Sequence, residues 1–141
     1  MKRVISILLL LSLLLSFVAC NRWQEVTDVS CEDIIAAYEK AGYILGHHLH
    51  EDPVYLEEGI CCSLQFKDPE NPDKNYIYIE RHTTTEGAYQ ATKKNRHNLV
   101  TWFVFGLSGE GRWLRSEQLG ELHCTTFEGK MMKPLRDIAR R

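Results

Sequence analysis

The sequence contains no internal repeat, no low-complexity segment and no compositional bias of a disordered or collagen-like chain. Charged residues at 26% and apolar residues at 44% are typical of a globular protein. An excess of basic residues is also missing: two of the 17 basic and none of the 19 acidic residues precede residue 20, so the remainder carries a net charge of −4 with neutral histidines. Because nucleic-acid binding needs a basic surface, we expect no nucleic-acid partner.

A complete catalytic motif is missing as well. Residues 106–110, Gly-Leu-Ser-Gly-Glu, resemble the nucleophile elbow of serine hydrolases, but Glu110 occupies the position of the second glycine that the turn requires. The acidic segment 68–73 lacks the regular oxygen positions and central glycine of a calcium loop. Carboxylates elsewhere show no pairing for acid–base catalysis. We therefore expect no catalytic residue and no cofactor, which favours a non-enzymatic protein.

The first 20 residues have the character of an export signal. Lys2 and Arg3 form a cationic start, and residues 4–18 are an unbroken run of apolar residues and serines leading to Ala19 and Cys20. A spanning helix needs about 20 apolar residues, so this run of roughly 15 is too short for a permanent membrane span. An ordinary secretory signal followed by a cysteine is the alternative, and both interpretations export the chain.

Segment 15–20, Leu-Ser-Phe-Val-Ala-Cys, resembles the lipobox of bacterial lipoprotein precursors. Ala19 and Cys20 match that pattern, whereas Phe17 stands where leucine is usual. The resemblance implies cleavage after Ala19, lipidation of Cys20 and attachment of the protein to a membrane outside the cytoplasm. We accordingly divide the chain into a signal peptide (1–19), a tether (20–29) and a single domain (30–141), which is long enough for one hydrophobic core.

Capping and alternation patterns predict the order helix, three strands, helix, two strands. Ser30 and Asp33 form a capping box for a first helix that Gly42 ends. The predicted strands are 43–50, 60–66, 76–82, 113–116 and 121–127, with an acidic loop at 51–59 and a hairpin loop at 68–73. A second capping box at 83–86 begins the next helix, and 133–138 form a closing helical turn.

Segment 99–105 fits two structures. The helical spacing of apolar residues continues from Ala88 to Phe103 without proline or glycine, which favours one long helix ending at the 108–111 turn. The β-branched and aromatic content of 99–105 fits a strand instead. We favour the helix and keep the strand as an open alternative.

These elements predict an α+β fold: one small domain with an antiparallel sheet and helices packed on one face. The other face would carry Tyr76, Tyr78, Glu80 and His82. The domain also resembles a type of small bacterial lipoprotein, in its early helical Cys31, in Gly42-Tyr43 and in residues 109–113, Gly-Glu-Gly-Arg-Trp. That resemblance implies no activity.

Four cysteines follow Cys20, and an even number of thiols outside the cytosol suggests two disulfides. Cys61 and Cys62 would point to opposite faces of a strand. Since Cys31 lies on the first turn of the helix that covers the face of Cys62, we prefer the pair Cys31–Cys62. Cys61 with Cys124 is the remaining pairing.

The segment His47-His48-Leu49-His50 is the candidate for metal binding, because imidazoles are common zinc and copper ligands, with His82 on a nearby strand. On a strand only His48 and His50 share a face, so one ion could use at most two of the three. We therefore expect no metal, and an exported metal-binding protein or hydrolase built on His47, His48, His50 and His82 is the alternative function.

Aromatic residues supply the remaining surface candidates. We assign Trp102 and Phe103 to the core and consider Tyr76, Tyr78 and Trp113 as interface residues. The export signal and the missing catalytic motif together predict a lipid-anchored, non-enzymatic binding module at a bacterial cell envelope. Its expected partners are the membrane, through the lipid on Cys20, and a protein or another envelope component.

Overall fold

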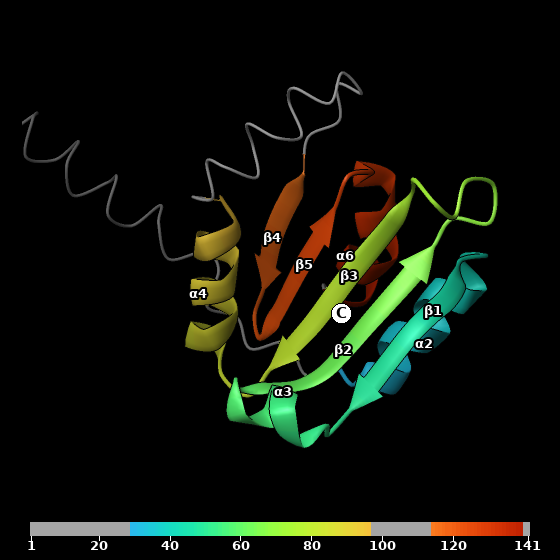
Figure 1. Cartoon of the computed structure of the whole chain (residues 1–141). Helices are drawn as coiled ribbons and strands as arrows, with labels where there is room; N and C mark the ends of the chain where they lie inside the picture. The colour runs from blue at the N-terminus through green and yellow to red at the C-terminus, as the bar shows by residue number, and fades with distance from the viewer. Residues whose placement is uncertain (1–28, 97–113, 140–141) are drawn as a thin grey trace, which may run out of the picture.

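The computed structural model describes residues 29–96 and 114–139. Five antiparallel strands form one sheet in the order β1-β2-β3-β5-β4 (Figure 1). The strands are β1 (Ile44–His50), β2 (Ile60–Lys67), β3 (Tyr76–His82), β4 (Arg115–Leu119) and β5 (Leu122–Thr126). The helices are α2 (Cys31–Lys40), α3 (Pro53–Glu57), α4 (Thr85–Arg96), the 3-10 helix η1 (Gly129–Met132) and α6 (Lys133–Ala139). The predicted α+β class and the antiparallel sheet are confirmed.

Helix α2 begins at the predicted capping box. The Ser30 hydroxyl accepts a hydrogen bond from the Asp33 amide at 3.1 Å, and the Asp33 carboxylate accepts one from the Ser30 amide at 3.1 Å. Both bonds satisfy amides that the first helical turn leaves free. The chain leaves the helix through Gly42 at φ 85°, a conformation that glycine adopts without strain.

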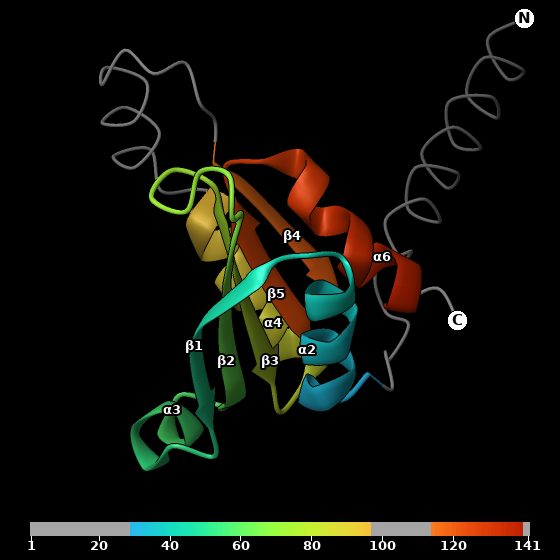
Figure 2. The ribbon, with the colours of Figure 1, turned by 90° about the vertical axis from the view of Figure 1, so that its right-hand side faces the viewer.

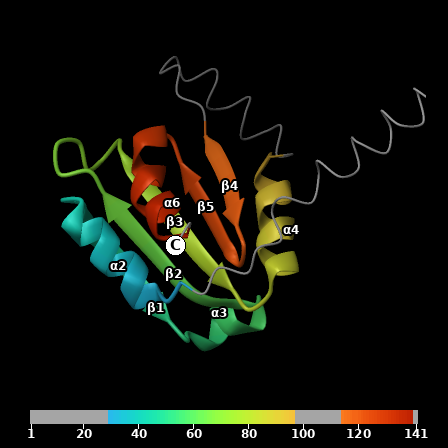
Figure 3. The same ribbon diagram turned by 180° about the vertical axis from the view of Figure 1, so that it is seen from behind.

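One face of the sheet, which we call the core face, packs against α2 and α6 (Figures 2 and 3). The Tyr38 ring of α2 stacks on Phe66 of β2 with centroids 4.2 Å apart, and its hydroxyl donates to the Met131 carbonyl at 2.7 Å. Val29 is only 7% exposed and belongs to this core, so packing begins within the segment predicted as a tether. The core therefore joins both ends of the described chain.

Strand β1 departs from its predicted alternation because of a β-bulge between Leu45 and His47. Leu45 lies opposite Phe66 on the core face, whereas His47 lies opposite Gln65 on the other face. Strict alternation along 43–50 predicts Tyr43, Leu45, His47 and Leu49 on one side of the strand. A bulge inserts one unpaired residue, so every side chain after it points to the opposite face of the sheet. The alternation of apolar and polar residues in the sequence does not show where a bulge occurs.

The predicted loop at 51–59 contains a short helix. Asp52 caps α3 by accepting a hydrogen bond from the Val54 amide at 3.0 Å, and Pro53 occupies the first helical position. Proline has a suitable φ there and lacks only an amide that would be unpaired. The acidic segment thus forms a helical turn between β1 and β2.

Helix α4 begins one residue later than the predicted box, because Thr84 rather than Thr83 accepts a hydrogen bond from the Gly87 amide, at 3.1 Å. It contacts β3, β4 and β5 on the face opposite α2 and α6, where its Asn95 meets His123 of β5. The helices were expected on one face and are instead divided between two. Capping fixes where a helix starts but not which face it covers.

The C-terminal hairpin and the closing helical turn are present as β4, β5 and α6. None of the helices within 29–96 and 114–139 is long and apolar enough to cross a membrane. Several predictions lie outside the described residues: the signal peptide, Cys20, the alternative at 99–105, the 106–110 motif, Trp102, Phe103 and Trp113.

Candidate functional site

An open groove of about 700 Å³ lies between α4 and the second face of the sheet. We call this second face the groove face. Side chains of β3, β5 and α4 line it, among them Tyr78, Glu80, His82, Ala91, Asn95 and His123. The part of the second face beside α4 thus carries several polar side chains.

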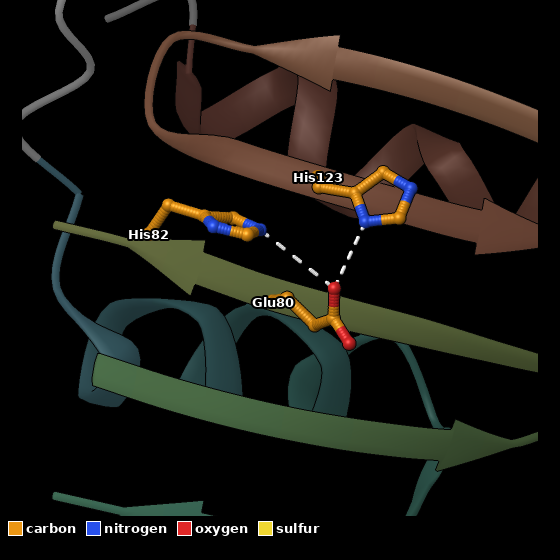
Figure 4. Close-up of side chains that lie close together, drawn as sticks. All are labelled: Glu80, His82 and His123. Carbon is orange, nitrogen blue, oxygen red and sulfur yellow. Dashed lines mark hydrogen bonds and ion pairs between the residues drawn. The ribbon is translucent and has the colours of Figure 1, made fainter. Parts of the chain in front are cut away.

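Glu80, His82 and His123 form a compact cluster within this groove (Figure 4). The Glu80 Oε2 atom lies 2.9 Å from His123 Nδ1 and 3.7 Å from His82 Nε2. One nitrogen from each ring and one carboxylate oxygen all lie within 4.8 Å of one another. Two imidazoles therefore converge on a single carboxylate.

Strand register produces this cluster. Glu80 of β3 lies directly opposite His123 of β5, and directly opposed residues in an antiparallel pair project from the same face. His82 follows Glu80 by two residues on β3, which returns its side chain to that face. The cluster exists because β5 pairs with β3 rather than only with its hairpin partner β4.

The hydrogen bonds of His123 indicate its tautomer. Its Nε2 lies 3.1 Å from the Asn95 amide nitrogen, 3.1 Å from Ser116 Oγ and 3.2 Å from Thr125 Oγ1. Since the Asn95 amide donates, Nε2 accepts and the proton resides on Nδ1, which donates to Glu80. Each ring nitrogen of His123 thus has a defined role.

His82 is in a different situation. It is 5% exposed, and its Nε2 is buried without a hydrogen-bond partner among the described residues. The 3.7 Å separation from Glu80 Oε2 is too long for a hydrogen bond. A buried polar atom without a partner typically costs about 1–3 kcal/mol, so a bound water, an ion or a ligand at this nitrogen would stabilise the fold.

The two imidazoles also set the charge of Glu80. The hydrogen bond from His123 and then the neighbouring His82 lower the pKa of Glu80 from 4.5 to about 2, against the opposing effect of burial. Glu80 is consequently a carboxylate at neutral pH. The cluster presents one negative oxygen and two nitrogens to the groove.

The row Ser116, His123 and Glu80 has the residue types of a hydrolase triad, but its geometry does not suit nucleophilic attack. Ser116 is only 8% exposed beneath α4, so a substrate carbonyl has no approach to its Oγ. The single lone pair of His123 Nε2 already accepts from Asn95, which leaves it unable to take a hydroxyl proton. The cluster is better suited to binding than to acyl transfer.

The predicted histidine group is divided by the structure. His47, His48 and His50 are all exposed on the edge strand β1, where the rings of His48 and His50 lie 6.2 Å apart. His50 lies opposite Cys62 on the core-face side of β1, whereas His82 lies on the groove face. His82 therefore joins Glu80 and His123 instead of the other three.

His123 is not among the site residues predicted from the sequence. Its place between the buried Leu122 and Cys124 was a signal that it points away from the core. Which residue it would meet there depended on the pairing of β5 with β3, which alternation does not specify. His123 could not be assigned to the site because the register between β3 and β5 was unknown from the sequence.

Cys31 of α2 and Cys62 of β2 pair as a disulfide, the pair preferred from the sequence. The second predicted pair, Cys61–Cys124, is wrong, because both cysteines are free. Strand β3 separates their strands, which places β2 and β5 about 9–10 Å apart, beyond the 4.4–6.8 Å that a disulfide usually spans between Cα atoms. Cys61 donates to the Arg81 carbonyl at 3.3 Å, and burial raises the pKa of the Cys124 thiol.

The tyrosines predicted as interface residues lie next to the groove. Tyr78 is 42% exposed, and its hydroxyl accepts a hydrogen bond from Gln65 at 2.7 Å. Tyr76 is half-buried and packs edge-to-face against Tyr78 and Phe127. Tyr78 therefore offers an accessible aromatic surface at the groove, while Tyr76 supports it.

Comparison of the chain with protein-family models, curated proteins and solved structures found no match. The fold and the groove define the chain as a small α+β domain with a polar candidate ligand site on one sheet face. The side chains of that site supply the basis for a functional proposal.

Proposed function

We propose that this protein is an extracytoplasmic, lipid-anchored binding module whose ligand occupies the groove beside α4. The observation that carries the proposal is the groove itself, which is lined by the ionised carboxylate of Glu80 and by His82, whose buried Nε2 has no hydrogen-bond partner among the described residues. A face built only for stability would bury apolar side chains there. An open groove in which a few polar side chains converge is typical of a binding site.

The export leader supports the location. Ala19 and Cys20 fit acylation of the cysteine, and residues 21–28 separate Cys20 from the buried Val29. Eight residues reach at most about 29 Å when fully extended. An anchor at Cys20 would therefore hold the groove close to the membrane surface, where envelope components are its available ligands.

A non-enzymatic role is supported by the same geometry. Ser116 is buried, and the thiol of Cys124 is fully enclosed with a raised pKa, so neither is placed to attack a substrate. The alternative of an exported metal-binding protein gains support from one observation, the convergence of His82 and His123 on Glu80. That alternative specifies a ligand for the binding module rather than replacing it.

The location is tested by membrane fractionation and labelling with a radioactive fatty acid. Wild-type chain should be labelled and sediment with membranes, and globomycin should cause the full-length precursor to accumulate. Cys20→Ser should abolish labelling, whereas the control Cys61→Ser should leave it unchanged. Equal labelling of the wild type and Cys20→Ser would refute the anchor.

The groove is tested by nuclear magnetic resonance of the full chain in detergent, with an extract of the cell envelope added. Amide signals of Glu80, Ala91 and Thr125 should shift. Ala91→Tyr, which fills the groove, should suppress the shifts, and Ala36→Tyr on the exposed surface of α2 should retain them. Shifts confined to residues outside the groove would contradict the binding role assigned to it.

A further inference from the structure

The groove contains the only group of three histidine, cysteine or acidic side chains within the described residues whose ligand atoms lie close enough to share a metal ion. We propose that Glu80, His82 and His123 bind one divalent transition-metal ion, with Zn²⁺ the ion best suited to two nitrogens and one oxygen. This inference names a ligand for the groove and thus rests on the proposed binding function. It is independent of the lipid anchor.

The distances suit a first coordination shell. In a tetrahedral zinc site with bonds of about 2.0–2.1 Å, neighbouring ligand atoms lie ~3.3 Å apart. Glu80 Oε2 lies 2.9 Å from His123 Nδ1 and 3.7 Å from His82 Nε2, one slightly below and one slightly above that value. The two imidazole nitrogens lie within 4.8 Å of each other, and Figure 4 shows both rings directed at the same carboxylate oxygen, so side-chain rotation would have to draw the three ligand atoms together around an ion.

The unpartnered nitrogen of His82 is an independent argument. His82 is 5% exposed, and its Nε2 atom has no hydrogen-bond partner among the described residues although it points toward Glu80. A metal ion between the three side chains would coordinate this nitrogen. The same ion would neutralise the Glu80 carboxylate, so one ligand would satisfy both groups.

The surroundings of His123 fit the change of tautomer that metal binding requires. Coordination through Nδ1 moves the ring proton to Nε2 without altering the charge of the imidazole. Ser116 Oγ and Thr125 Oγ1, at 3.1 and 3.2 Å, are acceptors for that proton, and Asn95 becomes one if its amide turns over. Hydrogen bonds of this kind to the second ring nitrogen orient a metal-binding imidazole.

The three protein ligands would leave a fourth coordination position of a tetrahedral ion without a protein ligand. Sites with three protein ligands keep water or an exchangeable molecule at such a position, whereas structural zinc sites use four protein ligands. The ion would therefore remain accessible and could bind an anionic or nitrogen-containing group from the envelope. The chemistry favours ligand exchange at the metal over a purely structural ion.

Isothermal titration of the full chain in detergent with Zn²⁺ at neutral pH, without a histidine tag, tests the proposal. We expect one equivalent to bind saturably. Glu80→Gln and His82→Gln should each weaken binding by about 100-fold or more, since loss of a group that only hydrogen-bonds to a metal ligand typically costs 10–100-fold. His50→Ala removes an exposed histidine of β1 and is the matched control, with binding unchanged.

A second readout needs no variant. Zinc should shift the side-chain nitrogen signals of His82 and His123 in the wild-type spectrum and leave those of His47, His48 and His50 in place. Absent saturable binding, or binding lost in His50→Ala but kept in His82→Gln, would overturn the metal site. Such a result would leave membrane labelling through Cys20 and groove shifts with envelope extract as they are, so the failures are distinguishable.

Discussion

On the core face of the sheet, Leu64, Phe66 and Ile79 are at most 1% exposed and pack beneath α2 and α6. On the groove face, Tyr78 is 42% exposed and Glu80 lies between two imidazoles. The same strand β3 supplies residues to both faces by simple alternation. The contrast teaches that one face of this sheet holds the fold together while the other leaves polar groups available for a ligand.

Two aromatic residues on neighbouring strands sharpen the comparison most strongly. Phe66→Ala should lower the free energy of unfolding by about 3–5 kcal/mol, because it opens a cavity beneath Tyr38. Tyr78→Ala on the groove face should cost about 1 kcal/mol or less. Urea unfolding followed by circular dichroism measures the loss of unfolding free energy in each variant. Equal losses would contradict the claim that the core face supplies the stability and the groove face is free to bind a ligand.

The Cys31–Cys62 disulfide adds to the stability of the core face. Replacing Cys31 and Cys62 together with serine should reduce the free energy of unfolding by about 3–4 kcal/mol, because the bridge closes a loop across a sequence separation of 31 residues in the unfolded chain. Cys61→Ser is the control, since Cys61 is free and half-buried. Urea midpoints of the wild type, the double variant and the control are compared under non-reducing conditions. A peptide map of the unreduced protein with free thiols at both Cys31 and Cys62 would contradict the disulfide.

On the groove face, Glu80 should make the free energy of unfolding of the metal-free protein depend on pH. Unfolded Glu80 takes up a proton near pH 4.5, whereas the folded carboxylate stays ionised until about pH 2, so the free energy of unfolding falls as pH drops through this window. The Glu80 side chain is 29% exposed, and we expect about 2 kcal/mol after solvent screening. Unfolding of wild type and Glu80→Gln with a chelator present, from pH 5 to 2, isolates this contribution as their difference.

The smallest expected effect concerns the support of His123. Asn95→Ala removes a neighbour of its Nε2 from α4 and should weaken zinc binding about tenfold, with little change in the unfolding midpoint. Lys93→Ala, on the exposed surface of the same helix, should leave zinc binding unchanged. Titration calorimetry combined with thermal unfolding distinguishes this positioning role from a loss of folding, which would lower the melting temperature in parallel.

Local signals in the sequence predicted much of the core face. The Ser30 and Asp33 capping box, the hairpin between β2 and β3 and the apolar alternation of Ile77 and Ile79 each depend on residues close together in the chain. The Cys31–Cys62 pair followed from those elements. These features could be predicted because their physical causes are local.

The groove face could be predicted only in part. Alternation indicated that Glu80 and His82 point away from the core, but their meeting with His123 requires β5 to pair with β3 in one register. The bulge after Leu45 and the position of α4 over β4 and β5 likewise depend on long-range packing. Residues far apart in sequence form the candidate site, which is why spacing along the chain did not associate His123 with Glu80 and His82.

The central claim is that the groove face is built around a ligand for Glu80, His82 and His123. X-ray absorption at the zinc edge of the zinc-loaded full chain tests it most directly. The account predicts two imidazole nitrogens and one carboxylate oxygen at about 2.0–2.2 Å, with one imidazole lost in His82→Gln. A spectrum with sulfur ligands, or with the same two imidazoles in wild type and His82→Gln, would contradict it.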